Sequence, residues 1–133
     1  MTGIEVLILS GGFHVLLLFA HGTYIALSAG LAWGTGRRDT PVTRTDLGRR
    51  FERTVTNNVE SLVAFVPIMA AGLFVEAHSA VTGTAALIYL LARIAFSAVY
   101  LANVPYVRTA LWFCGQLATA TIAVVTLVSV IPE

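Results

Sequence analysis

Four polar side chains with helical spacing could form a binding site. They are separated by three, four and three positions, which places them on one face of a helix: Arg50, Arg53, Asn57 and Glu60. Two guanidinium groups, an amide and a carboxylate offer both donors and acceptors to a charged ligand. Taken singly, Arg49, Arg50 and Arg53 are more typical of a helix end with snorkelling side chains. For the four residues together we favour a binding site.

A second group of polar residues lies in the last third of the chain: Arg93, Tyr100 and Arg108. Arg93 lies about halfway along an apolar segment, which is too deep for its guanidinium to reach water easily. Because a charged side chain in a membrane helix normally faces the protein interior and pairs there, we expect Arg93 to have a carboxylate partner. Glu60 is the best candidate for that ion pair.

The segments that carry these residues have the composition of membrane helices. Of the 133 residues, 57% are hydrophobic and 11% are charged, whereas soluble domains contain about 25% charged residues. We therefore expect an all-α integral membrane protein, a four-helix bundle in a single domain over residues 1–133. The four spans are predicted at about residues 4–33, 47–77, 80–102 and 106–131.

The distribution of basic residues predicts the orientation of these spans. Six arginines lie between residues 37 and 53, in and just after the loop that joins the first two spans. Since cytoplasmic loops are enriched in arginine and lysine, this loop is predicted to be cytoplasmic. Four spans then place both termini on the opposite side of the membrane. Thr45 or Asp46 is expected to cap the second span.

The sequence gives no indication of a metal site or of nucleic-acid binding. Cys114 is the only cysteine, so a cage of cysteine ligands cannot form within the chain. His14 and His21 are seven positions apart in the sequence, or about 10 Å apart on a helix, which is too far to share an ion. The arginine cluster lies between two spans and matches no nucleic-acid recognition motif.

Two motifs resemble those of the MAPEG family, the membrane-associated proteins in eicosanoid and glutathione metabolism. The first is RxxRxxxNxxE at Arg50 to Glu60, followed by an aromatic residue at Phe65. The second joins Ala92 and Arg93 to Tyr100 and to the PYVR segment that ends at Arg108. The chain length, the four spans and the basic first loop also resemble those of the family. The resemblance implies a bacterial-type member of the family, located in the bacterial inner membrane.

The resemblance implies a homotrimer of four-helix bundles that binds glutathione between adjacent subunits, near the cytoplasmic side. By position, Arg53, Asn57 and Glu60 resemble ligands of the charged ends of the tripeptide, and Tyr100 resembles a contact from the third helix. Arg50 and Arg93 belong to the same two motifs and are counted as cofactor-binding candidates. Two catalytic candidates follow from the same comparison by position: Arg108, which resembles an arginine facing the thiol, and Arg38 of the first loop.

The function that these features favour is a transferase or peroxidase that uses glutathione, or another low-molecular-weight thiol, on lipophilic electrophiles from the bilayer. A thiol is nucleophilic as its thiolate, which a nearby arginine stabilises. One alternative is a non-catalytic membrane protein that binds a lipid or a partner protein at the groove between subunits. Another is a small proton-coupled exporter, although Glu60 lies beside arginines that would hold it ionised.

Overall fold

The computed structural model describes residues 2–39, 41, 43–77 and 80–131; Met1, Thr40, Val42, His78, Ser79, Pro132 and Glu133 lie outside the described residues. The described part of the chain is almost entirely helical and contains no strand. Four of its helices are long and apolar enough to cross a membrane. The elements in chain order are α1 (Gly3–Ala29), the short α2 (Leu31–Thr35), α3 (Asp46–Phe74), α4 (Ala80–Leu101) and α5 (Pro105–Val130).

Local sequence signals account for where the helices begin. Thr2 and Glu5 form a capping box at the start of α1, in which each side chain bonds the backbone of the other residue. Thr45, one of the two predicted caps, accepts a hydrogen bond of 3.0 Å from the backbone N–H of Gly48 at the start of α3. Pro105 occupies the first turn of α5, where its missing N–H costs no helical hydrogen bond.

The predicted continuation of the first helix to Trp33 is wrong. The helix ends at Ala29 because Gly30 adopts a φ of 92°, a conformation that a helix cannot contain and that glycine tolerates at little cost. The chain then turns into α2, which carries Trp33. The other three helices begin and end within three residues of the predicted spans, and α3 continues through Pro67.

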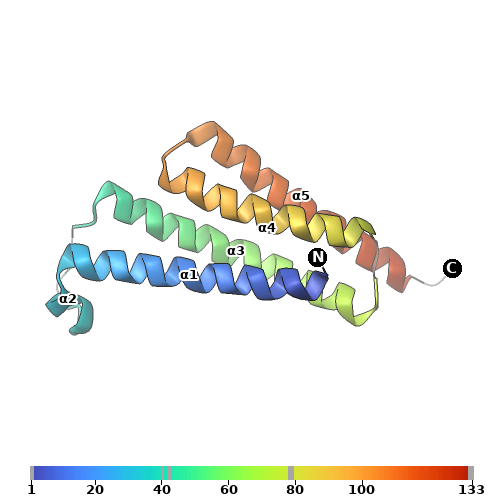
Figure 1. Cartoon of the computed structure of the whole chain (residues 1–133), viewed down its shortest axis with the longest axis horizontal. Coiled ribbons are helices and arrows are strands. Elements are labelled where there is room, and N and C mark those ends of the chain that lie inside the picture. Colours follow the sequence, from blue (N-terminus) through green and yellow to red (C-terminus); the bar gives the residue numbers. More distant parts are fainter. Residues whose placement is uncertain (1, 40, 42, 78–79, 132–133) are drawn as a thin grey trace.

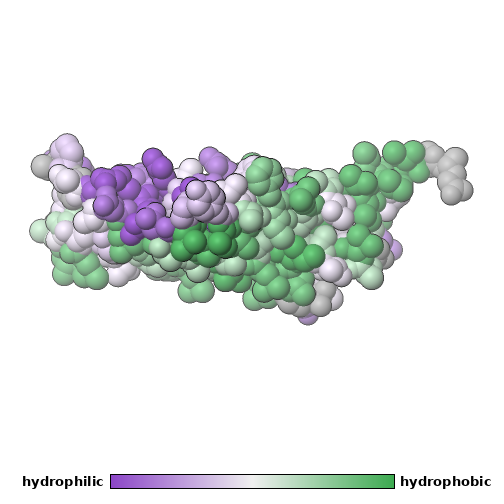
Figure 2. Space-filling model, turned by 90° about the horizontal axis from the view of Figure 1, so that it is seen from above, coloured by the Kyte–Doolittle hydropathy of each residue, from purple (hydrophilic) through white to green (hydrophobic). Residues whose placement is uncertain are grey.

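The helices form an antiparallel bundle (Figure 1). The most extensive contact joins α4 to α5, and α3 lies against α1, α4 and α5. Both termini lie at one end of the bundle, whereas α2, the start of α3 and the turn between α4 and α5 lie at the other end (Figure 1). The arginines of α3 and Arg108 are therefore at the same end. Figure 2 shows hydrophilic residues gathered at this end and hydrophobic residues over the remaining length.

The core of the bundle is built around one aromatic pair. The rings of Phe65 on α3 and Tyr89 on α4 stack with their centroids 3.7 Å apart, and Met69 and Ile122 pack in the same cluster. The rest of the cluster is mainly small or aliphatic, with Val6, Ala85, Ala86, Leu90 and Ala118. Small residues allow membrane helices to approach closely and gain packing contacts, which explains the extensive contact between α4 and α5.

Removing the ring of Phe65 tests this description of the core. Phe65 is fully buried, and a buried Phe→Ala change usually costs about 3–5 kcal/mol because a cavity remains. We expect Phe65→Ala to lower the unfolding free energy by about 3 kcal/mol, measured by reversible denaturation in detergent. Phe74→Ala is the matched control on the same helix, because Phe74 is 89% exposed. Equal losses in the two variants would contradict the assigned core.

Candidate functional site

A cationic cavity lies at the end of the bundle where the arginines gather. Its volume is about 320 Å³. Its walls come from the first two turns of α3, the end of α4 with the turn that follows it, and the first turn of α5. The lining residues are Asp46, Arg49, Arg50, Arg53, Tyr100, Asn103 and Arg108. Residues from the two sequence motifs therefore meet in one cavity, although the motifs lie far apart in the chain.

The turn between α4 and α5 positions Arg108 at this cavity. Asn103 adopts a left-handed conformation with a φ of 62°, which asparagine tolerates better than most residues. Pro105 then starts α5 in a new direction. The guanidinium carbon of Arg108 lies 4.6 Å from the centroid of the Tyr100 ring, within the range of a cation–π contact. Tyr100 thus supports Arg108 as well as lining the cavity.

The cavity has an excess of positive charge. Asp46 is its only carboxylate, and it forms an ion pair with Arg49. Arg50, Arg53 and Arg108 have no ion-pair partner among the residues that the structure describes. In addition, the buried Nε of Arg50 has no hydrogen-bond partner in the described part of the chain. Three guanidinium groups without counter-charges are suited to a ligand that carries carboxylates.

Asn57 and Glu60 extend the polar face of α3 beyond the cavity. Neither residue lines it. The side chain of Asn57 donates a hydrogen bond of 2.9 Å to the backbone oxygen of Arg53, and Glu60 is exposed. Both side chains are accessible to a molecule that lies along this face of α3.

Arg38 lines a different cavity of the chain. This second cavity has a volume of about 210 Å³, and Tyr24, Trp33, Arg38 and Arg44 are among its lining residues. The Arg38 guanidinium lies 5.5 Å from the ring centroid of Trp33 and donates a hydrogen bond of 2.9 Å to the backbone oxygen of Gly34. The structure does not bring Arg38 and Arg108 together in one cavity.

Arg93 lies inside the bundle, and its predicted ion pair with Glu60 is wrong. Arg93 is 3% exposed, and its Nε donates to Oδ1 of Asn58 at 3.3 Å. The reason is the rotation of α3 about its axis, which turns positions 54, 58, 61, 65, 69 and 72 toward the interior of the bundle. Glu60 lies on a different face of that helix, so it forms no ion pair in contact with Arg93. Its carboxylate acts on the Arg93 guanidinium only at longer range.

Sequence reasoning missed the polar core around Asn58. The amide of Asn58 donates to the backbone oxygen of Thr54 and to Ser97 Oγ, both at 2.9 Å. One turn further along α3, Ser61 donates to the Tyr89 hydroxyl at 3.1 Å. The signal was available, since Thr54, Asn58 and Ser61 share the helical period of Phe65. Asp46, Arg49 and Asn103 of the cationic cavity were missed as well, although each is adjacent to a predicted residue or turn.

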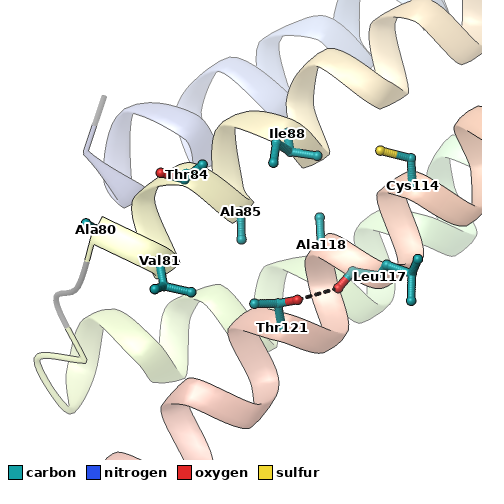
Figure 3. A pocket seen from close by; sticks show the side chains of 9 residues that line it. All are labelled: Ala80, Val81, Thr84, Ala85, Ile88, Cys114, Leu117, Ala118 and Thr121. Carbon is teal, nitrogen blue, oxygen red and sulfur yellow. Dashed lines mark hydrogen bonds between the residues drawn. The ribbon is translucent and has the colours of Figure 1, made fainter.

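An apolar groove lies between α4 and α5, deeper along the bundle (Figure 3). Its volume is about 520 Å³. Cys114 lies at one end of the group of lining side chains, and Ala85 and Ala118 face each other across the groove (Figure 3). The remaining lining residues are Ala80, Val81, Thr84, Ile88, Leu117 and Thr121. Polar side chains contribute little to this groove, which suits a hydrocarbon chain better than a charged ligand.

Comparison with known proteins identifies one family. The model of the MAPEG family matches residues 6–128. The match extends over most of α1 to α5 and therefore includes every residue of the cationic cavity. No curated protein and no solved structure matches the chain.

Two adjacent asparagines test the distinction between the polar core and the outer face of α3. We expect Asn58→Ala to lower the unfolding free energy by about 2–3 kcal/mol, because it leaves the Nε of Arg93 without its partner and removes the hydrogen bond that Ser97 Oγ accepts. Asn57→Ala is the matched control and should cost about 0.5 kcal/mol or less, as surface changes usually do. Reversible denaturation in detergent measures both. A larger loss for Asn57→Ala would contradict the inward orientation of Asn58.

Proposed function

This chain belongs to the MAPEG family, and from that membership we propose that it is a membrane-bound transferase or peroxidase. Its cosubstrate is glutathione or another low-molecular-weight thiol, and its acceptors are lipophilic electrophiles. One observation carries this proposal. Arg50, Arg53 and Arg108 line one cavity at the end of a membrane bundle and lack ion-pair partners in the described part of the chain.

The charges of glutathione complement the polar face of α3. The tripeptide carries two carboxylates and one ammonium group. Arg50 and Arg53 offer guanidinium groups, which bind carboxylates with two parallel hydrogen bonds. Glu60 is an exposed carboxylate further along the same helix, and it supplies the partner for the ammonium group. Asn57, between Arg53 and Glu60, supplies an amide to the peptide backbone of the ligand.

Arg108 activates the thiol in this proposal. A thiolate beside a guanidinium group is stabilised by its charge, which lowers the free energy of deprotonation. Because the arginine side chain stays protonated in proteins, it cannot accept the thiol proton, which is released to solvent. Tyr100 holds the Arg108 guanidinium by its ring face and restricts the positions from which it contacts the sulfur.

The complete site requires a second subunit. Arg38 and Arg108 line separate cavities within one chain, and the face of α3 that carries Asn57 and Glu60 is open. We propose a homotrimer in which Arg38 of a neighbouring subunit approaches this face. Such an arrangement covers the polar face of α3 with protein, which a charged face beside hydrocarbon needs.

The proposed orientation places the cationic cavity at the cytoplasmic side of a bacterial inner membrane. The basic loop and Arg108 share this end of the bundle, as the excess of arginine in cytoplasmic loops predicts. Both termini are then on the opposite side. Acceptors would be lipophilic because they reach the site through the bilayer, and the apolar groove between α4 and α5 gives the bundle a surface for a hydrocarbon chain.

A second candidate function is binding of a lipid or a partner protein without catalysis. Ser61 and Phe96 favour it, because both are buried in the subunit core. Ser61 is hydrogen-bonded to Tyr89, and the Phe96 ring lies 4.5 Å from the guanidinium carbon of Arg93. Neither Ser61 on α3 nor Phe96 on α4 is free to contact a ligand that binds along α3. The proposed thiol site therefore has no contact from these two residues.

Titration of the purified protein with glutathione, followed by ultraviolet difference absorbance, tests the proposed function. We expect a saturable thiolate band in the wild-type protein. Arg108→Ala should abolish the band, and Arg53→Ala should weaken binding about tenfold or more, because a charge-assisted hydrogen bond is lost. Arg37→Ala, which changes an exposed arginine of the loop, is the matched control and should leave the titration unchanged.

The two candidate functions give different results in this titration. Binding by calorimetry without a thiolate band, and without a conjugate for any electrophile tried, would favour the non-catalytic candidate. A thiolate band that persists in folded Arg108→Ala would remove Arg108 from the chemistry.

A further inference from the structure

A small polar cavity lies inside the bundle, separate from the cationic cavity. Three helices form it, with Ser10 and Phe13 from α1, Asn58 and Leu62 from α3, and Tyr89, Leu90 and Arg93 from α4. Its volume is about 10 Å³. A volume of this order has room for one species of about the size of a water molecule.

Arg93 brings a charge to this cavity that no anion in the described part of the chain contacts directly. The Glu60 carboxylate acts on it only at longer range. Its Nη1 and Nη2 atoms are buried and have no hydrogen-bond partner among the described residues. No carboxylate lines the cavity, and Arg93 forms no ion pair with any residue that the structure describes. The Phe96 ring contacts the guanidinium, but a cation–π contact compensates much less charge than an anion does. Since arginine cannot become neutral, its burial calls for a counter-charge.

The other polar groups at the cavity are available as donors. Ser10 is 4% exposed, and its hydroxyl has no partner in the described part of the chain. The Tyr89 hydroxyl accepts a hydrogen bond from Ser61, which leaves its own proton for an acceptor. The Asn58 oxygen already accepts from Arg93. Donors around a cation suit an anion, whereas a water molecule would bring no compensating charge.

We propose that this cavity binds one small monovalent anion of the halide type, such as chloride. The anion accepts hydrogen bonds from the two terminal nitrogens of Arg93 and from the hydroxyl of Ser10. It neutralises the guanidinium inside the bundle and links α1 to α4 through a shared ligand. The site lies within one subunit and does not involve the cationic cavity, so it is independent of the proposed reaction with thiols.

Thermal unfolding of the full chain in detergent tests this proposal. Sodium chloride and sodium bromide are compared with sodium gluconate at equal ionic strength, so that general screening is constant. We expect a saturable rise in the unfolding midpoint, about 5 °C at ten times the dissociation constant. The halide-dependent rise should disappear in Arg93→Gln and fall by half or more in Ser10→Ala.

Two matched variants separate this site from anion binding at the surface. Arg37→Gln and Ser129→Ala change exposed residues and should retain the full halide response. If Arg93→Gln does not fold, Ser10→Ala and its control decide the result. A midpoint that responds equally in Ser10→Ala and Ser129→Ala would overturn the proposal.

Anomalous diffraction from crystals grown in bromide gives the second measurement. A peak beside Nη1 and Nη2 of Arg93 supports the site. Peaks confined to exposed arginines would show an adventitious ion only and overturn it. A water molecule at Arg93, or a carboxylate of the assembled protein paired with it, would also overturn the proposal.

Discussion

Arginine placement is the constraint on which the rest of this structure depends. A guanidinium facing hydrocarbon costs several kcal/mol, about 2.5–3.5 by insertion measurements, and arginine cannot escape that cost by losing its proton. The fold meets the constraint in two ways. Most arginines belong to the loop before α3, the first turns of α3 and the first turn of α5, at the hydrophilic end of the bundle (Figure 2). Four of them line one open cavity. Arg93 is enclosed among three helices with Asn58.

These two environments have opposite consequences for ligands. The open cavity leaves Arg50, Arg53 and Arg108 accessible, so their charges are available to carboxylates and to a thiolate. The guanidinium of Arg93 is buried and does not line the same cavity. Its role in thiol binding, which came from its place in the second motif, stays a prediction.

Much of the fold followed from the sequence, because hydrophobic length and helix caps are local signals. The proximity of Arg53 and Arg108 followed as well, since an antiparallel bundle brings the start of α3 and the start of α5 to one end. The partner of Arg93 did not follow. It depends on the rotation of α3, which places Asn58 inward and Glu60 outward, and that rotation is fixed by the packing of Phe65 against Tyr89. The break at Gly30 depends on a single φ angle.

A structure of the assembled protein with glutathione bound, determined by cryo-electron microscopy, would show the proposed thiol site itself. We expect a trimer in which the sulfur lies beside the Arg108 guanidinium and the carboxylates contact Arg50 or Arg53. Arg38 should approach the same molecule from a neighbouring subunit. Glutathione bound away from this cavity, or an assembly that covers the polar face of α3 and leaves no room for glutathione, would contradict the proposed site.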